Sequence, residues 1–374
     1  MASRVNHHDV LVIGGGVIGL SLAWELSLHN VKVCVVDRSQ FGQEASWAGA
    51  GMIPPGPQPA FRMSANTVEQ LEGLSQLLHQ AWHQQLRELT GIDNGYRQCG
   101  GLYLATNDIE ANTLHEGMRR WKNLGVEAYT IDATEVSDLE PALADGPVAA
   151  CVVPDEAQIR NPWHLKALLA ACRLSGVDLR PDVEVCRFQT TTAGITAVET
   201  SGGLIHAEQF CLSAGCWTGK LAASIGLELP VRPIRGQIVL VAGAPGLLRR
   251  NVCVGQRYLV SRSDGLILIG STEESVGFEN RNTEEAVAEL TAFATSLVPE
   301  LGKFSIEKCW SGLRPATSDG LPYLGRVPHL SNAWLSTGHF RAGLQLSPAT
   351  AVVMRSLLLG EVPPLDVKPL GIER

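Results

Sequence analysis

The sequence has no long uninterrupted apolar run and little charge. Its longest apolar stretch, Val10–Trp24, is broken by glycines, so no membrane-spanning helix is predicted. Charged residues make up 18% and hydrophobic residues 45% of the chain, which is typical of a globular and not of a disordered protein. A length of 374 residues is more than one compact core requires and favours two domains.

The sequence also lacks an excess of positive charge and paired cysteine motifs. Its 30 Lys and Arg against 38 Asp and Glu give a net charge of −8, so we expect no basic surface for nucleic acid. The nine cysteines, spread from Cys34 to Cys309 without a CxxC pair, form neither a metal-site nor a disulfide pattern. Because no signal-peptide pattern is visible either, we expect a cytoplasmic protein without a metal.

A glycine motif stands between two predicted strands near the N-terminus. The apolar run Val10–Ile13 is followed at once by Gly14-x-Gly16-x-x-Gly19 and then by a helical pattern. Gly14 permits a tight turn, Gly16 lets the backbone approach a pyrophosphate, and Gly19 lets the helix pack on the strand. The N-terminus of that helix then directs free N–H groups at the phosphates. The segment therefore predicts a dinucleotide site.

The second predicted strand, Val31–Val36, ends in Asp37, 23 residues after Gly14. An acidic side chain at this place accepts hydrogen bonds from ribose hydroxyls. The alternative is a glycine-rich turn in some other α/β protein, but strand, helix, strand and terminal acid within 30 residues favour the dinucleotide. An acid instead of an arginine disfavours a 2′-phosphate, so NAD or FAD is preferred over NADP.

Residues 41–52 favour FAD over NAD. A nicotinamide enzyme usually continues with further strand–helix units, whereas this segment is a loop of small residues such as Ala45, Ser46 and Gly51. Small residues let the main chain lie against a large flat ligand. A flexible surface loop is the alternative, for which Trp47 and Met52 are poor choices.

The remaining patterns predict an α/β fold, with a Rossmann-type cofactor domain interleaved with a substrate domain on a mostly antiparallel sheet. Val231–Val241 and Val252–Ile269 are rich in strand formers, which is typical of that second layer. Phe210–Trp217 indicates a buried strand that returns beside the first nucleotide strand. The cofactor domain is predicted to comprise residues 1–90, 140–225 and 305–374, and the substrate domain residues 91–139 and 226–304.

Several helices are also predicted. The helix 67–89 has Asn66 as its cap and an apolar stripe for the core. The helix 162–174 has Pro162 at its first position and Asn161 as its cap. A further helix is expected from about 349 to 359.

Three late motifs carry candidate chemical groups. Tyr258 lies in YLVSR, Arg314 in GLRPATSDGLPYLG and Arg341 in GHFRAG. Through these motifs as a set, and essentially from end to end, the chain resembles the FAD-dependent amine oxidases that include glycine oxidase, D-amino-acid oxidase and sarcosine oxidase. Within that family it resembles glycine oxidase of the thiamine-biosynthesis type.

The resemblance implies roles for these three residues. Arg314 would grip a substrate carboxylate bidentately, since a planar guanidinium matches a carboxylate. Tyr258 would hydrogen-bond the same carboxylate. Arg341 would lie beside the flavin, where it either orients the substrate or holds its own loop through main-chain carbonyls. The competing interpretations are a solvated or ion-paired Arg314 and a Tyr258 that only packs.

The resemblance also implies how FAD is held. N–H groups of the loop Gly338–Leu344 would lie near the flavin pyrimidine oxygen. His339 is assigned as a cofactor contact, because hydride transfer from a neutral amine needs no strong base. Cys309 lacks the sequence context in which sarcosine oxidases bind FAD covalently, so we expect non-covalent FAD. The predicted cofactor contacts are Gly14, Gly16, Val17, Ile18, Gly19, Asp37, Arg38, Ala45, Ser46, Ala50, Gly51, Met52, Val185, Gly215, Trp217, Gly338, His339, Phe340, Arg341, Ala342, Gly343 and Leu344.

The implied reaction is oxidation of glycine, sarcosine or a small D-amino acid to an imine, which hydrolyses or feeds thiazole synthesis. Oxygen would reoxidise the flavin and give hydrogen peroxide. Two alternatives stay open: a D-amino-acid dehydrogenase that passes electrons to a quinone, and a non-catalytic flavin-binding protein. The expected partners are a small amino acid and oxygen, and a homo-oligomer is compatible with the sequence.

Overall fold

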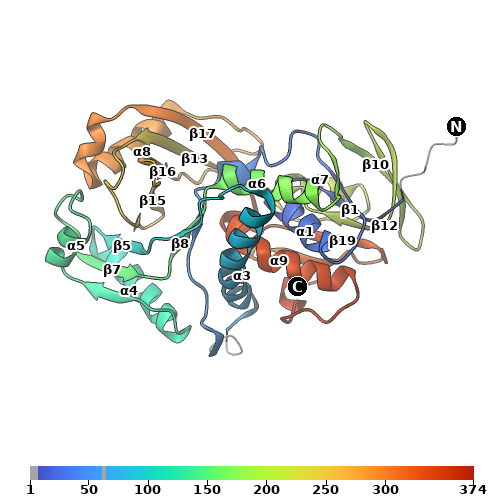
Figure 1. Cartoon of the computed structure of the whole chain (residues 1–374), viewed down its shortest axis with the longest axis horizontal. Helices are drawn as coiled ribbons and strands as arrows, with labels where there is room; N and C mark the ends of the chain where they lie inside the picture. The colour runs from blue at the N-terminus through green and yellow to red at the C-terminus, as the bar shows by residue number, and fades with distance from the viewer. Residues whose placement is uncertain (1–6, 61–64) are drawn as a thin grey trace.

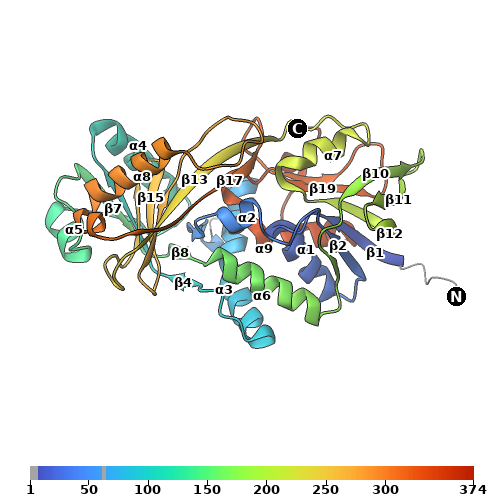
Figure 2. The same ribbon diagram turned by 90° about the horizontal axis from the view of Figure 1, so that it is seen from above.

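The computed structural model describes residues 7–60 and 65–374. Figures 1 and 2 show two large sheets at opposite ends of the longest axis, with α3 and α6 between them. Within the described residues the helices are α1 (Val17–Ser27), α2 (Ala45–Ala48), α3 (Thr67–Thr90), α4 (Asp108–Asn123), α5 (Ala133–Leu139), α6 (Asn161–Leu174), α7 (Thr218–Ala223), α8 (Glu284–Leu297) and α9 (Gly343–Leu358). Short 3-10 turns occur at Gly215–Trp217, Pro299–Lys303, Phe340–Ala342 and Lys368–Leu370.

The first sheet is built around β1 (His7–Ile13), which pairs in parallel with β2 (Val33–Val36) and β12 (Gly203–Leu212). Leu11 of β1 lies opposite Phe210 of β12, so the predicted return of this strand beside the nucleotide strand is confirmed. The other strands of this sheet are β9 (Asp178–Arg180), β10 (Val185–Thr190), β11 (Ile195–Thr200), β18 (Tyr323–Arg326) and β19 (Ala333–Thr337).

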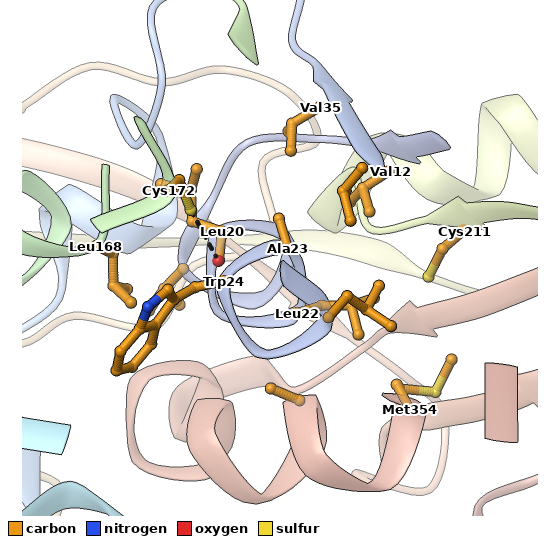
Figure 3. Packing of buried hydrophobic residues seen from close by; sticks show 14 of the residues in the cluster. Val12, Leu20, Leu22, Ala23, Trp24, Val35, Leu168, Cys172, Cys211 and Met354 are labelled. Carbon is orange, nitrogen blue, oxygen red and sulfur yellow. Dashed lines mark hydrogen bonds between the residues drawn. The ribbon is translucent and has the colours of Figure 1, made fainter. Parts of the chain in front are cut away.

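The apolar sequence of β1 follows from burial on both of its faces. On one face, Val12 of β1 belongs to a buried cluster with Trp24 of α1, Leu168 of α6 and Met354 of α9 (Figure 3). On the other face, Leu11 of β1 belongs to a second buried cluster. The thiol of Cys172 in α6 donates to the Leu20 carbonyl at 3.5 Å. Each fully buried large apolar side chain of this cluster contributes roughly 1.5–3 kcal/mol to the stability of the fold. α1, which follows the glycine turn, is therefore fixed to the sheet and to α6 and α9 by packing.

The second sheet runs in the order β17-β13-β16-β15-β14-β5-β7-β6. All of its strand pairs are antiparallel except β14 with β5, which confirms the mostly antiparallel layer. The strands are β5 (Gly101–Ala105), β6 (Tyr129–Ile131), β7 (Ala149–Val153), β13 (Arg232–Ala242), β14 (Asn251–Val254), β15 (Arg257–Ser261), β16 (Leu266–Gly270) and β17 (Ile306–Ala316). A small sheet of β3 (Met52–Ile53), β8 (Ala157–Gln158) and β4 (Arg97–Gln98) completes the strands.

Two strands of the second sheet, β7 and β17, come from residues that were predicted to belong to the cofactor domain. β7 and β17 pair within the second sheet, although residues 140–225 and 305–374 were expected in the cofactor domain. We propose the predicted division with one change: β7 and β17 are assigned to the substrate domain, because they pair with strands of the second sheet. Residues 1–6 and 61–64 of the predicted segment 1–90 lie outside the described residues.

Helix boundaries differ from the predictions at two places. Arg160, not Asn161, is the N-cap of α6, because the Asn161 side chain donates to the Ser46 carbonyl at 2.9 Å instead. α9 begins at Gly343 and contains Pro348, which has no N–H for the Leu344 carbonyl; that carbonyl accepts from the Ser347 hydroxyl at 2.9 Å. Asn66 caps α3 as predicted, accepting from the Glu69 N–H at 3.0 Å. Within the described ranges, no helix is long and apolar enough to cross a membrane.

Candidate cofactor and substrate site

A cavity of about 630 Å³ joins the two sheets. It begins at the carboxyl ends of β1 and β2, where Gly14 and Asp37 line it, and reaches the face of the second sheet at Ile238 and Tyr258. Ligands of parallel α/β sheets bind outside the carboxyl ends of the strands. The cavity therefore brings the predicted cofactor motif and the predicted substrate residues into one space.

The glycine motif leaves no room for side chains. Gly14 has φ +112°, and a Cβ on it would lie 2.5 Å from the Ser213 carbonyl oxygen. A Cβ on Gly19 would lie 1.9 Å from the Gly14 carbonyl oxygen, so Gly19 allows α1 to pack on the turn. Gly19 itself does not line the cavity, whereas Gly14 and Gly16 do. Gly19 thus serves the packing of α1, and its predicted contact with the cofactor stays a prediction.

The first helix presents its N-terminus to the cavity. Gly16 is the N-cap of α1 and provides no side-chain cap, while Val17 and Ile18 line the cavity. The Val17 N–H donates to the Ser46 hydroxyl at 2.9 Å, which joins the motif to the small-residue loop. The first N–H groups of a helix, together with the helix dipole, favour an anion such as a phosphate.

Asp37 holds the glycine turn as well as lining the cavity. Its Oδ2 accepts from the Gly15 N–H at 2.7 Å, and its Oδ1 accepts from the Ser39 N–H at 2.9 Å. Next to it, the Arg38 guanidinium lies 4.0 Å from the centre of the Trp217 ring and pairs with Glu44 at 3.3 Å. These side chains form one polar end of the cavity.

A second helix N-terminus faces the same cavity. The chain passes from Gly338, with φ +81°, through the turn Phe340–Ala342 into α9, which has no side-chain cap. His339 is buried, and its Nε2 lies 3.1 Å from the Thr350 hydroxyl. Burial lowers the pKa of His339 to about 3, so its imidazole is neutral at physiological pH. The loop offers backbone N–H groups and a neutral ring.

Arg314 occupies the substrate end of the cavity. Its Nη1 donates to the Thr272 carbonyl at 3.0 Å, and its Nη2 donates to the Ser271 hydroxyl at 2.8 Å. Burial lowers the pKa of Arg314 from its ordinary value, while the nearby Tyr258 raises it. An arginine remains charged under such shifts. Two of its five donors are thus fixed by Thr272 and Ser271, and Tyr258 is a further hydrogen-bond partner of the same guanidinium.

Tyr258 and Arg341 complete this end of the cavity. Tyr258 lies opposite Gly270 on β16, where a Cβ would come within 2.7 Å of the phenol oxygen. Arg341 donates from Nε to Oε2 of Glu273 at 3.1 Å, and its Nη2 contacts the same oxygen. The structure thus brings all three predicted residues to the cavity wall.

Other cavity residues were missed by the sequence analysis. Tyr103 and Lys220 line the cavity from elements far apart in the chain, and no local motif marks them. Glu44 also lines it, within the segment 41–52 that the sequence analysis had indicated, but was not named there as a contact. Gly236 and Gly312 face each other across β13 and β17, and glycines inside strand patterns were a usable signal of close approach. Apart from Gly19, every predicted cofactor contact lines the cavity.

These residues fit FAD. Two helix N-termini, whose N-cap residues provide no side-chain bond, face the cavity; an acid lies beside the first, and glycines there admit no Cβ. Cys309 is absent from the residues that line the cavity in the described chain, which agrees with non-covalent binding. Cys216 and Cys253 do line it, and burial raises the pKa of both thiols, so neither is a ready nucleophile.

Comparison with known proteins agrees with this site. Residues 9–357 match the model of the family described as FAD dependent oxidoreductase. The chain is 37% identical to a glycine oxidase of Pseudomonas putida over 98% of both chains. It is 35% identical to the bifunctional protein ThiO/ThiG of Trichormus variabilis, over 94% of this chain and 52% of that protein.

The fold is also similar to that of a glycine oxidase. The crystal structure of glycine oxidase from Geobacillus kaustophilus superposes with a TM-score of 0.92 at 32% identity, over 98% of this chain and 99% of that chain. The resemblance inferred from the three late motifs is confirmed, and so is the FAD cofactor. The chain belongs to the FAD-dependent oxidoreductase family that includes the glycine oxidases.

Proposed function

We propose that this protein oxidises glycine or a similarly small amine, such as sarcosine or a small D-amino acid, to the imine. Oxygen is the proposed electron acceptor and hydrogen peroxide the second product. The likeness to glycine oxidases over nearly the full chain supports this activity.

The observation that carries the proposal is the state of Arg314. Among the arginines that line the cavity, Arg38 pairs with Glu44, Arg257 with Glu289 and Arg341 with Glu273. Arg314, in contrast, is hydrogen-bonded to the Thr272 carbonyl, the Ser271 hydroxyl and Tyr258, and within residues 7–60 and 65–374 it forms no ion pair with a carboxylate. A half-buried guanidinium without a carboxylate partner, in a cavity, suits the carboxylate of an amino acid.

The chain's own residues position the substrate. Arg314 binds the carboxylate, and the Tyr258 hydroxyl is placed to donate to it. Ile238 and Leu313, which also line the cavity, exclude water from the reacting carbon. The N–H groups at the start of α9, which has no side-chain cap, would stabilise negative charge on the ring of the bound flavin. Bound FAD supplies the two-electron acceptor for the substrate Cα–H bond.

We further propose that the imine product passes to thiazole synthesis in the cytoplasm. The likeness to a bifunctional protein supports coupling to a second activity, since that protein is about twice as long as the part that matches. All nine cysteines are free, as in proteins of a reducing compartment.

A substrate panel with two acceptors tests the proposal. Purified holoenzyme is given glycine, sarcosine, D-alanine or an amine without a carboxylate, and oxygen uptake and peroxide are measured. We expect one peroxide per oxygen consumed with a small amino acid. Turnover only with a quinone dye would favour the dehydrogenase, and no turnover with any acceptor would favour a non-catalytic flavoprotein.

A further inference from the structure

Resting on the proposed function, we infer that Glu273 restricts the substrate to amines with a single carboxylate. It does so by occupying Arg341, the second guanidinium at the substrate end of the cavity. Glu273 is thereby a specificity-determining residue.

The contact between Glu273 and Arg341 uses two N–H groups. Nε and Nη2 of Arg341 both donate to Oε2 of Glu273, the first at 3.1 Å. This is the side of the guanidinium that would otherwise receive a carboxylate bidentately. Arg341 and Glu273 both act electrostatically on Arg314: the Arg341 charge lowers the pKa of Arg314, and the Glu273 charge raises it. The charges of Arg314, Arg341 and Glu273 are therefore close enough to interact with one another.

The backbone around Glu273 is fixed on both sides. Before it, Ser271 and Thr272 receive the two donors of Arg314. After it, Glu274 accepts from Arg235 at 3.2 Å and from Gln237 at 2.8 Å, and its backbone pairs with that of Arg235. Because the neighbours on both sides are held, Glu273 is kept beside Arg341.

The charges then select the substrate. Arg314 and Arg341 carry two positive charges, and Glu273 leaves a net charge of one, which a single carboxylate balances. Arg257 also lines the cavity, but it pairs with Glu289 at 3.6 Å and lies over the Phe293 ring. A second carboxylate on the substrate would have to displace Glu273 or lie beside it, and both cost binding energy.

The experiment compares two substrates that differ in one carboxylate. Iminodiacetate and N-ethylglycine are both N-substituted glycines of similar size, and only iminodiacetate carries a second carboxylate. We expect Glu273→Gln to raise the ratio of their kcat/KM values, iminodiacetate over N-ethylglycine, by at least about tenfold, since a freed guanidinium gains a charge-assisted bond. The double variant Glu273→Gln/Arg341→Met should return the ratio to near the wild-type value.

A binding measurement separates this inference from the proposed function. Malonate and propanoate are titrated into each holoenzyme, and the change in the flavin absorption spectrum gives the Kd. Glu273→Gln should tighten malonate relative to propanoate by a similar factor, with or without turnover. The control is Glu116→Gln, which removes the same charge from an exposed pair with Arg119 on α4, and it should leave both ratios unchanged.

The outcomes are distinct. If both ratios stay unchanged in Glu273→Gln, the inference is wrong even when glycine is oxidised normally. If the gain persists in the double variant, Arg341 is not the group that Glu273 occupies, and the inference is again wrong. Absence of amine oxidation with a clear shift in malonate binding would overturn the proposed function and leave the charge selection standing.

Discussion

The guanidinium of Arg314 lies directly over Gly236 on the neighbouring strand. A Cβ at Gly236 would stand 2.1 Å from Nη2 of Arg314. In the register of β13 and β17, Gly236 is opposite Gly312, two residues from Arg314. The side chain therefore lies flat along the sheet surface towards the cavity, and the glycine is as necessary to its direction as Ser271 and Thr272 are to its position.

Removing the Arg314 side chain should weaken substrate binding selectively. A charge-assisted bidentate bond contributes roughly 1.5–3 kcal/mol, so Arg314→Ala should raise the KM for glycine by at least about tenfold. Amines without a carboxylate should be affected much less, and FAD content should stay near normal. An unchanged KM with FAD retained would place the carboxylate grip elsewhere, with Arg341 the next candidate. Loss of flavin together with activity would make Arg314 structural.

Flavin should be bound without a covalent link. Cys309, the position considered for such a link, is absent from the cavity lining in the described chain. Acid or heat should precipitate the protein and release FAD into the supernatant, where its absorption and fluorescence identify it. Yellow colour that stays in the washed precipitate would show that another side chain bonds the flavin.

A methyl group at Gly14 should abolish cofactor binding. Gly14 has φ +112°, and its Cβ would clash with the Ser213 carbonyl, so Gly14→Ala must move the turn away from the phosphate site. We expect the purified variant to lack the flavin spectrum. The matched control is Gly117→Ala in α4, where no heavy atom lies within 4 Å of the new Cβ. It should keep FAD and gain about 1 kcal/mol of stability from helix propensity.

Stability should fall as the pH is lowered below neutrality. Burial lowers the pKa of His79 to about 4, that of His164 to about 3 and that of His339 to about 3. The unfolded chain takes up these protons near pH 6.5, while the folded chain stays neutral. The stabilising effect is therefore complete above pH 6.5 and is lost as the pH falls towards these folded values, by about 1.4 kcal/mol per pH unit for each histidine.

Urea unfolding of the holoenzyme at pH 7, 6 and 5 measures this dependence. His79→Gln is an informative variant, because its amide still provides a donor for the Gln345 carbonyl that His79 contacts at 2.9 Å. Its unfolding free energy should change less between pH 6 and 5 than that of the wild type. Equal slopes in both proteins would contradict a neutral buried His79.

The sequence predicted best where the physical cause is local. The strand, turn and helix around Gly14 follow from apolar runs and glycines within 30 residues, so this part agrees with the structure. The small residues after Asp37 indicated a loop against a ligand; they do line the cavity, but Ala45–Ala48 form the short helix α2 and not a loop. The late motifs indicated Arg314 and Tyr258 through their resemblance to a known family, and both residues line the cavity.

Contacts between distant strands could not be derived. Glu273 has no distinctive neighbours in the sequence, and its role depends on Arg341, which lies 68 residues further along the chain. Asn161 was a reasonable helix cap by residue type, but a tertiary hydrogen bond to the Ser46 carbonyl took its side chain. β17 is close in sequence to β18 and β19 of the first sheet, but it pairs along its length with β13 of the second sheet, and no local pattern indicated that pairing.

The strand order of the first sheet determines when the flavin site can form during synthesis. β1 and the glycine turn are synthesised before β12 and β19 (Ala333–Thr337), which are both needed to complete the sheet beside them. α9 follows and packs on α1 as well as supplying the second helix terminus of the cavity. A chain that ends before Ala333 thus carries the whole nucleotide motif without a complete flavin site, and full flavin capture has to wait until β19 and α9 have been added.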